Sequence, residues 1–271
     1  MLARPRRSLS RRGRQLISSA AASALALTGL VALTAPVHAA DADADGPLAY
    51  VANFHADAVT VIDTGTNTVA RTINVGDSPI GVAVNPVDTR AYVTNFDDAT
   101  VSVIDTETSA VTATIPVGSN PLSVAFTPSG NRAYVANSGE ESVSVINTAT
   151  NTVTATVPVG GSPNGVAVSP SGTAVYVTNN NGATVSVIDT STNTATARVP
   201  VGSAPSGVAV SPSGSVAYVA NNSDDDSVSV IDTATHTVSA TIAVGSRPNG
   251  VSFDPSGARA YVADRGSDDV R

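Results

Sequence analysis

Apolar and polar positions alternate in short runs along most of this chain, and the same arrangement returns about every 42 residues. The run from Val153 to Val157 alternates with a period of two, which is typical of a half-buried β-strand. Val, Ile, Thr and Tyr dominate these runs, as expected of strands. Within one repeat, apolar runs separated by turn-forming residues lie at 122–126, 133–137, 143–146 and 153–159. The pattern predicts four strands per repeat and no helix after residue 48.

The tyrosines mark the period of the repeat. All six stand in one motif, at Tyr50, Tyr92, Tyr134, Tyr176, Tyr218 and Tyr261, and their spacings are 42 residues four times and 43 once. Four strands in a unit of this length predict one blade of a β-propeller. The predicted fold class is therefore all-β, a propeller of four-stranded antiparallel blades. We expect each tyrosine to lie between neighbouring blades, with its hydroxyl reaching polar partners at the rim.

The repeats predict a single propeller domain over residues 48–271. They are expected to start near residues 49, 91, 133, 175, 217 and 260, the last being incomplete. The first blade has no first strand within this domain, so five to six blades are represented. We expect a truncated sequence from a parent with more blades, since an unfinished ring exposes sheet edges. Pairing the strand at Val251 with the first blade, which would close a five-bladed ring, is the alternative.

The N-terminal segment has the three parts of a secretory signal peptide. Six arginines precede an apolar run from Leu16 to Thr34, and the small residues before Ala40 predict cleavage after Ala39. Residues 1–39 are therefore predicted to be a signal peptide, followed by a short acidic linker at 40–47. The expected location is extracellular or at the cell envelope, by general secretion or twin-arginine export. A single transmembrane anchor is the alternative; after cleavage no stable membrane insertion is expected.

The net charge and the cysteine content limit the classes of partner and the sources of stability that we expect. Without residues 1–39, eight arginines face 22 acidic residues, a net charge of −14. Such a surface repels phosphate backbones, so nucleic acid is not an expected partner. The chain has no cysteine, so packing alone must stabilise an exported protein. A protein, a glycan or a cell-wall component is the expected partner.

Two repeats carry a family resemblance in literal form. Tyr92-Val93-Thr94-Asn95 and Tyr176-Val177-Thr178-Asn179, together with Ser-Val-Ile-Asp-Thr at 102–106 and Pro-Val-Gly at 116–118, resemble the YVTN-type β-propeller repeats. The resemblance covers the chain from Leu48 onward and implies a WD40-like propeller. Members of that family include surface-layer and secreted proteins, and related propellers serve as binding platforms.

Candidate catalytic chemistry is sparse, and we predict no catalytic or cofactor-binding residue. His236 stands where other repeats have asparagine, which indicates a turn substitution, and His55 lies beside Asp57 in a polar loop. No Gly-x-Ser-x-Gly or haem-attachment motif is present. One repeat position carries Asp63, Asp105, Asp189 and Asp232, but Asn147 in the third blade. An amide can cap a turn but cannot replace a catalytic carboxylate, so this position is expected to be structural.

The loops between second and third strands are acidic in most repeats. Because strands alternate in direction, these loops are expected on the same face as the Gly-Ser-x-Pro links between blades. They predict either a solvated rim or a site for Ca²⁺ or a basic partner. The candidate calcium ligands are Asp57, Asp97, Asp98, Glu140, Glu141, Asp224, Asp225 and Asp226.

Three functions remain open from the sequence. The favoured one is a secreted, non-catalytic propeller that acts as a binding or scaffolding module. A propeller enzyme of lactonase or lyase type would need a cluster of acids, histidines or a metal around the centre, and such a site would break the symmetry of the repeats. A structural envelope or surface-layer protein that assembles through blade edges is the third.

Overall fold

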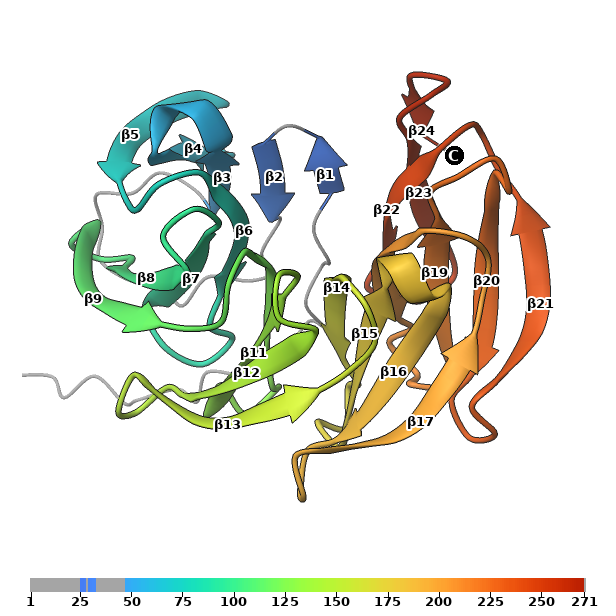
Figure 1. Ribbon diagram of the computed structural model, residues 1–271. Coiled ribbons are helices and arrows are strands. Elements are labelled where there is room, and N and C mark those ends of the chain that lie inside the picture. Colours follow the sequence, from blue (N-terminus) through green and yellow to red (C-terminus); the bar gives the residue numbers. More distant parts are fainter. Residues whose placement is uncertain (1–24, 28, 33–46, 271) are drawn as a thin grey trace, which may run out of the picture.

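The structure, a computed structural model, describes residues 25–27, 29–32 and 47–270. Antiparallel sheets stand face to face around a centre, with their first strands innermost (Figure 1). Strand is the dominant secondary structure in the described part of the chain, as the alternation of apolar and polar residues predicts. The all-β propeller prediction is confirmed. The predicted linker at 40–47 lies outside the described residues except for Pro47.

Four complete blades form the middle of the chain. Blade 2 is β6 (Pro79–Val84), β7 (Arg90–Asn95), β8 (Thr100–Asp105) and β9 (Ala110–Pro116). Blade 3 is β10 (Pro121–Phe126), β11 (Arg132–Asn137), β12 (Ser142–Asn147) and β13 (Thr152–Pro158). Blade 4 is β14 (Pro163–Val168), β15 (Ala174–Asn179), β16 (Thr184–Asp189) and β17 (Thr194–Pro200), and blade 5 is β18 (Pro205–Val210), β19 (Val216–Asn221), β20 (Ser227–Asp232) and β21 (Thr237–Ala243).

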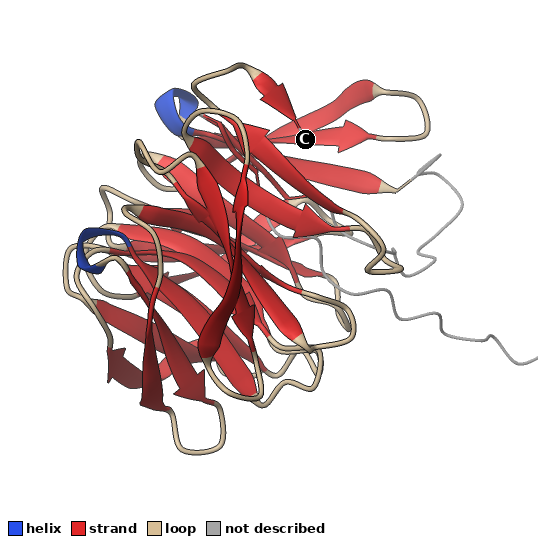
Figure 2. Cartoon of the chain, turned by 90° about the vertical axis from the view of Figure 1, so that its right-hand side faces the viewer, coloured by secondary structure: helices blue, strands red, loops and turns tan. Residues whose placement is uncertain are grey.

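The first and last blades differ from this plan. Blade 1 has β3 (Leu48–Asn53), β4 (Ala58–Asp63) and β5 (Thr68–Asn74), and blade 6 has β22 (Pro248–Phe253), β23 (Ala260–Asp264) and the short β24 (Asp269–Val270). Two short helical turns, η1 (Phe54–Ala56) and η2 (Asn180–Gly182), lie in loops on the same side of the molecule (Figure 2). No helix in the described part of the chain is long and apolar enough to cross a membrane.

The first-strand position of blade 1 is filled from the N-terminal segment. β2 (Gly29–Ala32) pairs with β3 and is preceded by β1 (Leu25–Leu27). The pairs Val31–Val51 and Ala32–Tyr50 reproduce the register of Val82–Val93 and Ala83–Tyr92 in blade 2. Both strands fall within the predicted signal peptide, which stays a prediction. The alternative of a five-bladed ring is wrong, because β22 pairs with β23 and forms a sixth blade.

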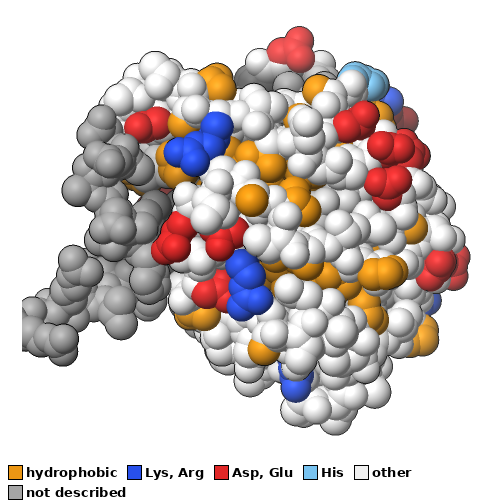
Figure 3. All heavy atoms as spheres, turned by 90° about the vertical axis from the view of Figure 1, so that its left-hand side faces the viewer, with side chains coloured by type: hydrophobic (Ala, Val, Ile, Leu, Met, Phe, Trp, Pro, Cys, Tyr) orange, Lys and Arg blue, Asp and Glu red, His pale blue; other side chains and the backbone are white. Residues whose placement is uncertain are grey.

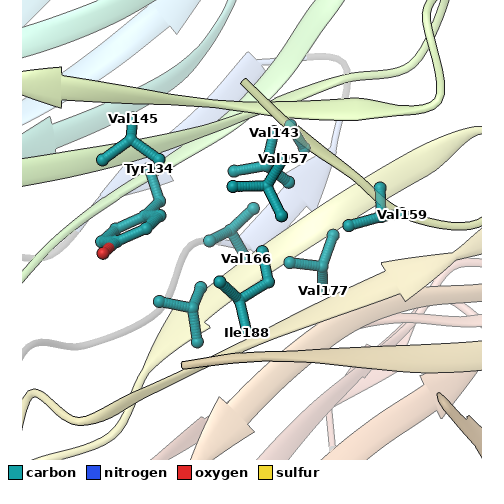
Figure 4. Close-up of a cluster of buried hydrophobic side chains, with 10 residues drawn as sticks. Tyr134, Val143, Val145, Val157, Val159, Val166, Val177 and Ile188 are labelled. Atoms are coloured by element: carbon teal, nitrogen blue, oxygen red, sulfur yellow. The ribbon is translucent and has the colours of Figure 1, made fainter. Parts of the chain in front are cut away.

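The hydrophobic core lies between blades. Figure 4 shows Tyr134 and Val143 of blade 3 facing Val166, Val177 and Ile188 of blade 4, and all five belong to one buried cluster. Successive residues of a strand point to opposite faces, so each middle blade buries one face against the blade before it and one against the blade after it. Small side chains are therefore needed on both faces, and each core depends on two blades.

Close approach at the centre requires glycine at position 81 in the first strand of blade 2. A Cβ atom at Gly81 would lie 2.4 Å from the carbonyl oxygen of Leu122 in the next blade, too close for any other residue. Thr94 strengthens the same contact, because its hydroxyl accepts the Gly81 N–H at 2.7 Å and donates to Leu122 at 2.9 Å. The first strands are thus fixed tightly against one another.

Candidate functional site on the link-side face

The two faces of the propeller carry different connections. We call link-side the face with the loops between second and third strands and the links between blades. We call turn-side the opposite face, with the turns between first and second and between third and fourth strands. Main-chain hydrogen bonds join the link-side segments: Val75 donates to Asp57 and Phe96 donates to Ser78. The equivalent bonds recur at every later junction up to Arg265 and Arg247, so a continuous belt holds the loops in place.

Acidic side chains of the loops bind the neighbouring links. Asp57 Oδ1 accepts the Ser78 N–H at 2.9 Å, and Asp98 Oδ2 accepts the Asp77 N–H at 2.8 Å. Four junctions further along, Asp226 Oδ1 accepts the Arg247 N–H at 2.9 Å. These carboxylates satisfy main-chain donors that strand pairing leaves free. A structural role therefore accounts for part of the acidity of the loops.

The remaining candidate calcium ligands are distributed over the same face. Asp97 accepts the Ser78 hydroxyl at 2.5 Å, Glu140 accepts the Ser119 hydroxyl at 2.8 Å, and Asp225 accepts the Ser203 N–H. Glu141 and Asp224 are exposed on the loops of blades 3 and 5. The eight candidates thus belong to the loops of four different blades and contact links at separate junctions, not around one point. Within the described ranges, no group of three or more His, Asp or Glu side chains is arranged to hold a metal.

Negative charge is most concentrated at the junction of blades 1 and 2. Asp77 is exposed, and Asp98, followed by Asp57 and Asp97, raises the pKa of its carboxyl group above the ordinary range by electrostatic repulsion. Asp77 was not singled out from the sequence, because it stands in a link and not in a loop. Among the residues that the structure describes, its own carboxylate accepts no hydrogen bond from a main-chain group, which separates it from Asp57 and Asp98.

Acidic side chains gather in groups on the outer surface in Figure 3, and basic side chains there are few. The groups are separated by uncharged surface of the strands, which carry mainly Thr, Ser and Val. The acidic loops project from the ends of the blades, where a partner could reach them without disturbing the packing between blades.

The turn-side face holds the aspartate position that recurs in the repeats. Asp63 Oδ1 accepts the N–H groups of Gly65 and Thr66 at 2.7 and 3.0 Å, and Asn147 in blade 3 does the same for Ala149 and Thr150 at 2.9 and 3.3 Å. Hydrogen bonds within the turn, from main-chain N–H groups at Asp105 and Asp232 and first from the Ser191 hydroxyl at Asp189, lower the pKa of these three carboxyl groups. These four acids add negative charge to the turn-side face.

The tyrosines reach the same turns from the preceding blade. Tyr92 donates its hydroxyl to Asn151 Oδ1 at 2.6 Å, and Tyr134 donates to Asn193 Oδ1 at 3.3 Å. Burial raises the pKa of Tyr92 to about 12. His236 occupies the corresponding turn position opposite Tyr176, with the left-handed backbone that asparagine adopts elsewhere. His55 lies in η1 with its ring edge-on to Phe54.

A sequence comparison now places the chain among known families. The family model described as "Lactonase, 7-bladed beta-propeller" matches residues 33–198. The chain belongs to this lactonase propeller family. The match supports the propeller fold. It does not identify the YVTN-type repeat or a surface-layer role. The described residues of this lactonase-family propeller account for six blade positions, and the family description names seven.

Solved structures agree with the fold of this lactonase-family propeller. One is "Kuenenia stuttgartiensis Hydrazine Synthase", with a TM-score of 0.59 and 19% identity, covering 86% of this chain and 97% of that one. Another is a functionally unknown protein from Desulfotomaculum acetoxidans DSM 771, with a TM-score of 0.71 and 19% identity, covering 80% of this chain and 72% of that one. At this identity the likeness shows the fold alone. No curated protein matches the sequence.

The last residue of the tyrosine motif is a buried structural position that sequence reasoning missed. Asn95 is fully buried, and its Nδ2 donates to the hydroxyls of Thr100 and Ser102 at 2.9 Å each. Asn137, Asn179 and Asn221 make the same pair of bonds in later blades. The signal was available, since an asparagine recurs at the end of five second strands. In this lactonase-family propeller the asparagine connects the second strand to the third strand below the link.

Proposed function

We propose that this chain is an exported, non-catalytic propeller that binds a cationic partner at the cell envelope through its link-side face. The observation that carries the proposal is the group of carboxylates at the junction of blades 1 and 2. Asp98, Asp57 and Asp97 raise the pKa of Asp77, so the four carboxylates repel one another. A basic segment of a partner would relieve this repulsion.

The uniformity of the blades supports binding over catalysis. The recurring polar residues, such as Asp63, Asn95 and Tyr92, are engaged in hydrogen bonds within the fold. The exposed differences between blades lie mainly in the acidic loops. A surface of this kind offers charge and shape to a partner, and no side chain within the described ranges has the environment of an activated nucleophile or base.

The Asp77 carboxylate allows a clean test. Asp77→Asn removes one charge and no hydrogen bond that the structure describes for that side chain. Hexalysine serves as the probe in a calorimetric titration at low and physiological salt. We expect Asp77→Asn to weaken binding by about threefold to tenfold, and we expect salt to weaken it further.

Glu107→Gln provides the matched control. It removes the same charge from an exposed turn-side position, and so changes net charge equally. Equal effects of the two variants, or no binding of hexalysine at either salt concentration, would contradict a link-side site. A parallel titration with CaCl₂ tests whether the acidic loops bind Ca²⁺ instead: heat and a raised melting temperature with Ca²⁺, without hexalysine binding, would favour the metal.

Hydrolysis of a lactone is the second candidate function, and membership of the lactonase family favours it. Purified chain is incubated with a panel of five- and six-membered lactones, and acid release is followed at constant pH. Turnover above the uncatalysed rate would overturn the non-catalytic part of the proposal. Hexalysine binding would still test the link-side surface separately.

A further inference from the structure

Two arginines occupy the same position in neighbouring blades. Arg90 begins β7 and Arg132 begins β11, and both lie half-buried on the turn-side face. Each donates from Nη1 to a main-chain carbonyl of the next blade, Arg90 to Thr148 and Arg132 to Thr190. Their structural roles between blades are therefore the same, and their electrostatic surroundings can be compared directly.

The charge of Arg90 is compensated within its own blade. Asp88 Oδ2 accepts from Arg90 Nε at 2.9 Å and also from Nη2. This pair is the only salt bridge within the described part of the chain. Asp105 of β8 is the cross-strand partner of Arg90. The Asp105 carboxylate accepts the N–H groups of Glu107 and Thr108 in its own turn, so Asp88 is the carboxylate that pairs with the Arg90 guanidinium group.

Blade 3 lacks both of these carboxylates. Gly130 stands at the repeat position of Asp88, and Asn147 is the cross-strand partner of Arg132 where blade 2 has Asp105. Arg132 also interacts with the hydroxyl of Tyr134, which is neutral at ordinary pH. The carboxylate that acts on this hydroxyl, Asp189, is itself bonded by Ser191 and Thr192 of its own turn. The positive charge of Arg132 therefore has no salt-bridge partner among the described residues.

A polar hollow of about 210 Å³ opens beside Arg132, between the turns of blades 3 and 4. Thr127 and Ser129 donate their hydroxyls to Asn131 Oδ1 at 3.0 and 2.8 Å, which fixes the amide orientation. The Asn131 side chain lines the same hollow, and its Nδ2 group has no hydrogen-bond partner among the described residues. The hollow thus combines a guanidinium group with an amide donor and several hydroxyls.

We propose that this hollow binds a small hydroxylated carboxylate, which takes at Arg132 the place that the Asp88 side chain takes at Arg90. The guanidinium fork suits a carboxylate in geometry and charge. The hydroxyl and amide groups of the lining suit the hydroxyls of a sugar-sized molecule. The site is on the turn-side face and is independent of the proposed link-side function, so either can fail alone.

Galacturonate and galactose form a matched pair of probes, because they share a ring and differ in the carboxylate. Binding to the full chain is followed by NMR, using the Arg Nε–H resonances. We expect saturable binding of galacturonate and none of galactose. Arg132→Gln should weaken galacturonate binding by about tenfold or more, since a charge-assisted hydrogen bond is lost.

Two further variants keep the test independent of folding. Arg90→Gln breaks the same kind of bond between blades and should leave binding unchanged. Asn147→Asp restores the missing cross-strand carboxylate, keeps the acceptor for Ala149 and Thr150, and should weaken binding severalfold with Arg132 intact. The proposal is overturned by unchanged binding in Arg132→Gln, by equal losses in Arg90→Gln, by unchanged binding in Asn147→Asp, or by equal binding of galactose.

Discussion

Tyr134 and Tyr261 occupy one position of the same repeat, yet their surroundings are opposite. Tyr134 in blade 3 is 0% exposed, and Tyr261 in blade 6 is 43% exposed. Blade 1 shows the complementary difference: Tyr50 is buried against blade 2, whereas Val51 and Ile62 on the other face are half-buried. Their counterparts in the middle blades are fully buried.

The comparison shows that burial in this protein belongs to pairs of blades. Strands of nearly the same sequence have two apolar faces in every blade. Each face is buried only where a neighbouring blade packs against it. The middle blades have two complete neighbours, while blade 6 has one in the described structure, with only the short β1 of the blade 1 sheet against its first strand β22. Stability should therefore vary with position along the chain although the sequence hardly changes, as nearest-neighbour models of repeat proteins predict.

Truncating the two tyrosines gives the largest expected contrast. Tyr134→Ala should destabilise the protein by about 3–5 kcal/mol, because it leaves a cavity between two blades. Tyr261→Ala should change stability by no more than about 0.5 kcal/mol, as is usual for exposed positions. Urea unfolding followed by circular dichroism measures both. Equal losses would mean that the blades are stabilised individually and not by their contacts.

Removing only the hydroxyl gives a smaller contrast. Tyr92→Phe deletes the bond to Asn151 of the next blade and should cost about 1 kcal/mol, whereas Tyr261→Phe should cost nothing measurable. The same variant predicts a pH effect. Burial raises the pKa of Tyr92 to about 12, so its contribution is complete below the unfolded value of about 10 and is lost as pH rises toward 12.

Alkaline unfolding of the wild type and Tyr92→Phe checks the sign. The variant should lose less stability than the wild type between pH 10 and 12. An identical pH dependence of the two proteins would show that the phenol titrates without unfolding the contact between blades.

The smallest contrast concerns the turns, where blade 3 already carries the neutral residue. The pKa values of Asp105, Asp189 and Asp232 are lowered by bonds from Thr108, Ser191 and Thr235. Their contribution is therefore present above the unfolded pKa of about 4 and is lost as pH falls through the lower folded values. Replacing all three by asparagine, as at Asn147, should flatten the fall of melting temperature below pH 4. If the fall of melting temperature below pH 4 is unchanged in this variant, other carboxylates cause the loss of stability in acid.

Much of the fold could be predicted from the sequence because the repeat is local. The spacing of Tyr50 to Tyr261 indicated the blades, and the alternation of strand directions put the acidic loops beside the links, as the belt of hydrogen bonds has them. The first strand of blade 1 could not be found in this way. Its residues 29–32 lie in an apolar run that resembles a signal peptide, and only pairing with β3 reveals the strand.

The candidate sites depend on contacts that the linear pattern hides. Asp77 gains its importance from Asp98 and Asp57, which lie about twenty residues away in neighbouring loops. Arg132 was not singled out from the sequence. Its difference from Arg90 depends on the contact of Asp88 with the Arg90 guanidinium, which Gly130 at the same position of blade 3 cannot make. Loops can be recognised from their composition. Which side chains of different loops come into contact depends on how the blades are arranged around the ring.

The most direct test of the link-side function is to map where a cationic ligand binds. Hexalysine is titrated into isotope-labelled protein at physiological salt, and backbone amide shifts are followed residue by residue. The account predicts shifts at Asp57, Asp77 and Asp97 and in the adjoining links, with the turn-side residues around Asp63 and Asp105 unaffected. Shifts confined to the turn-side face, or spread evenly over all acidic residues, would contradict it.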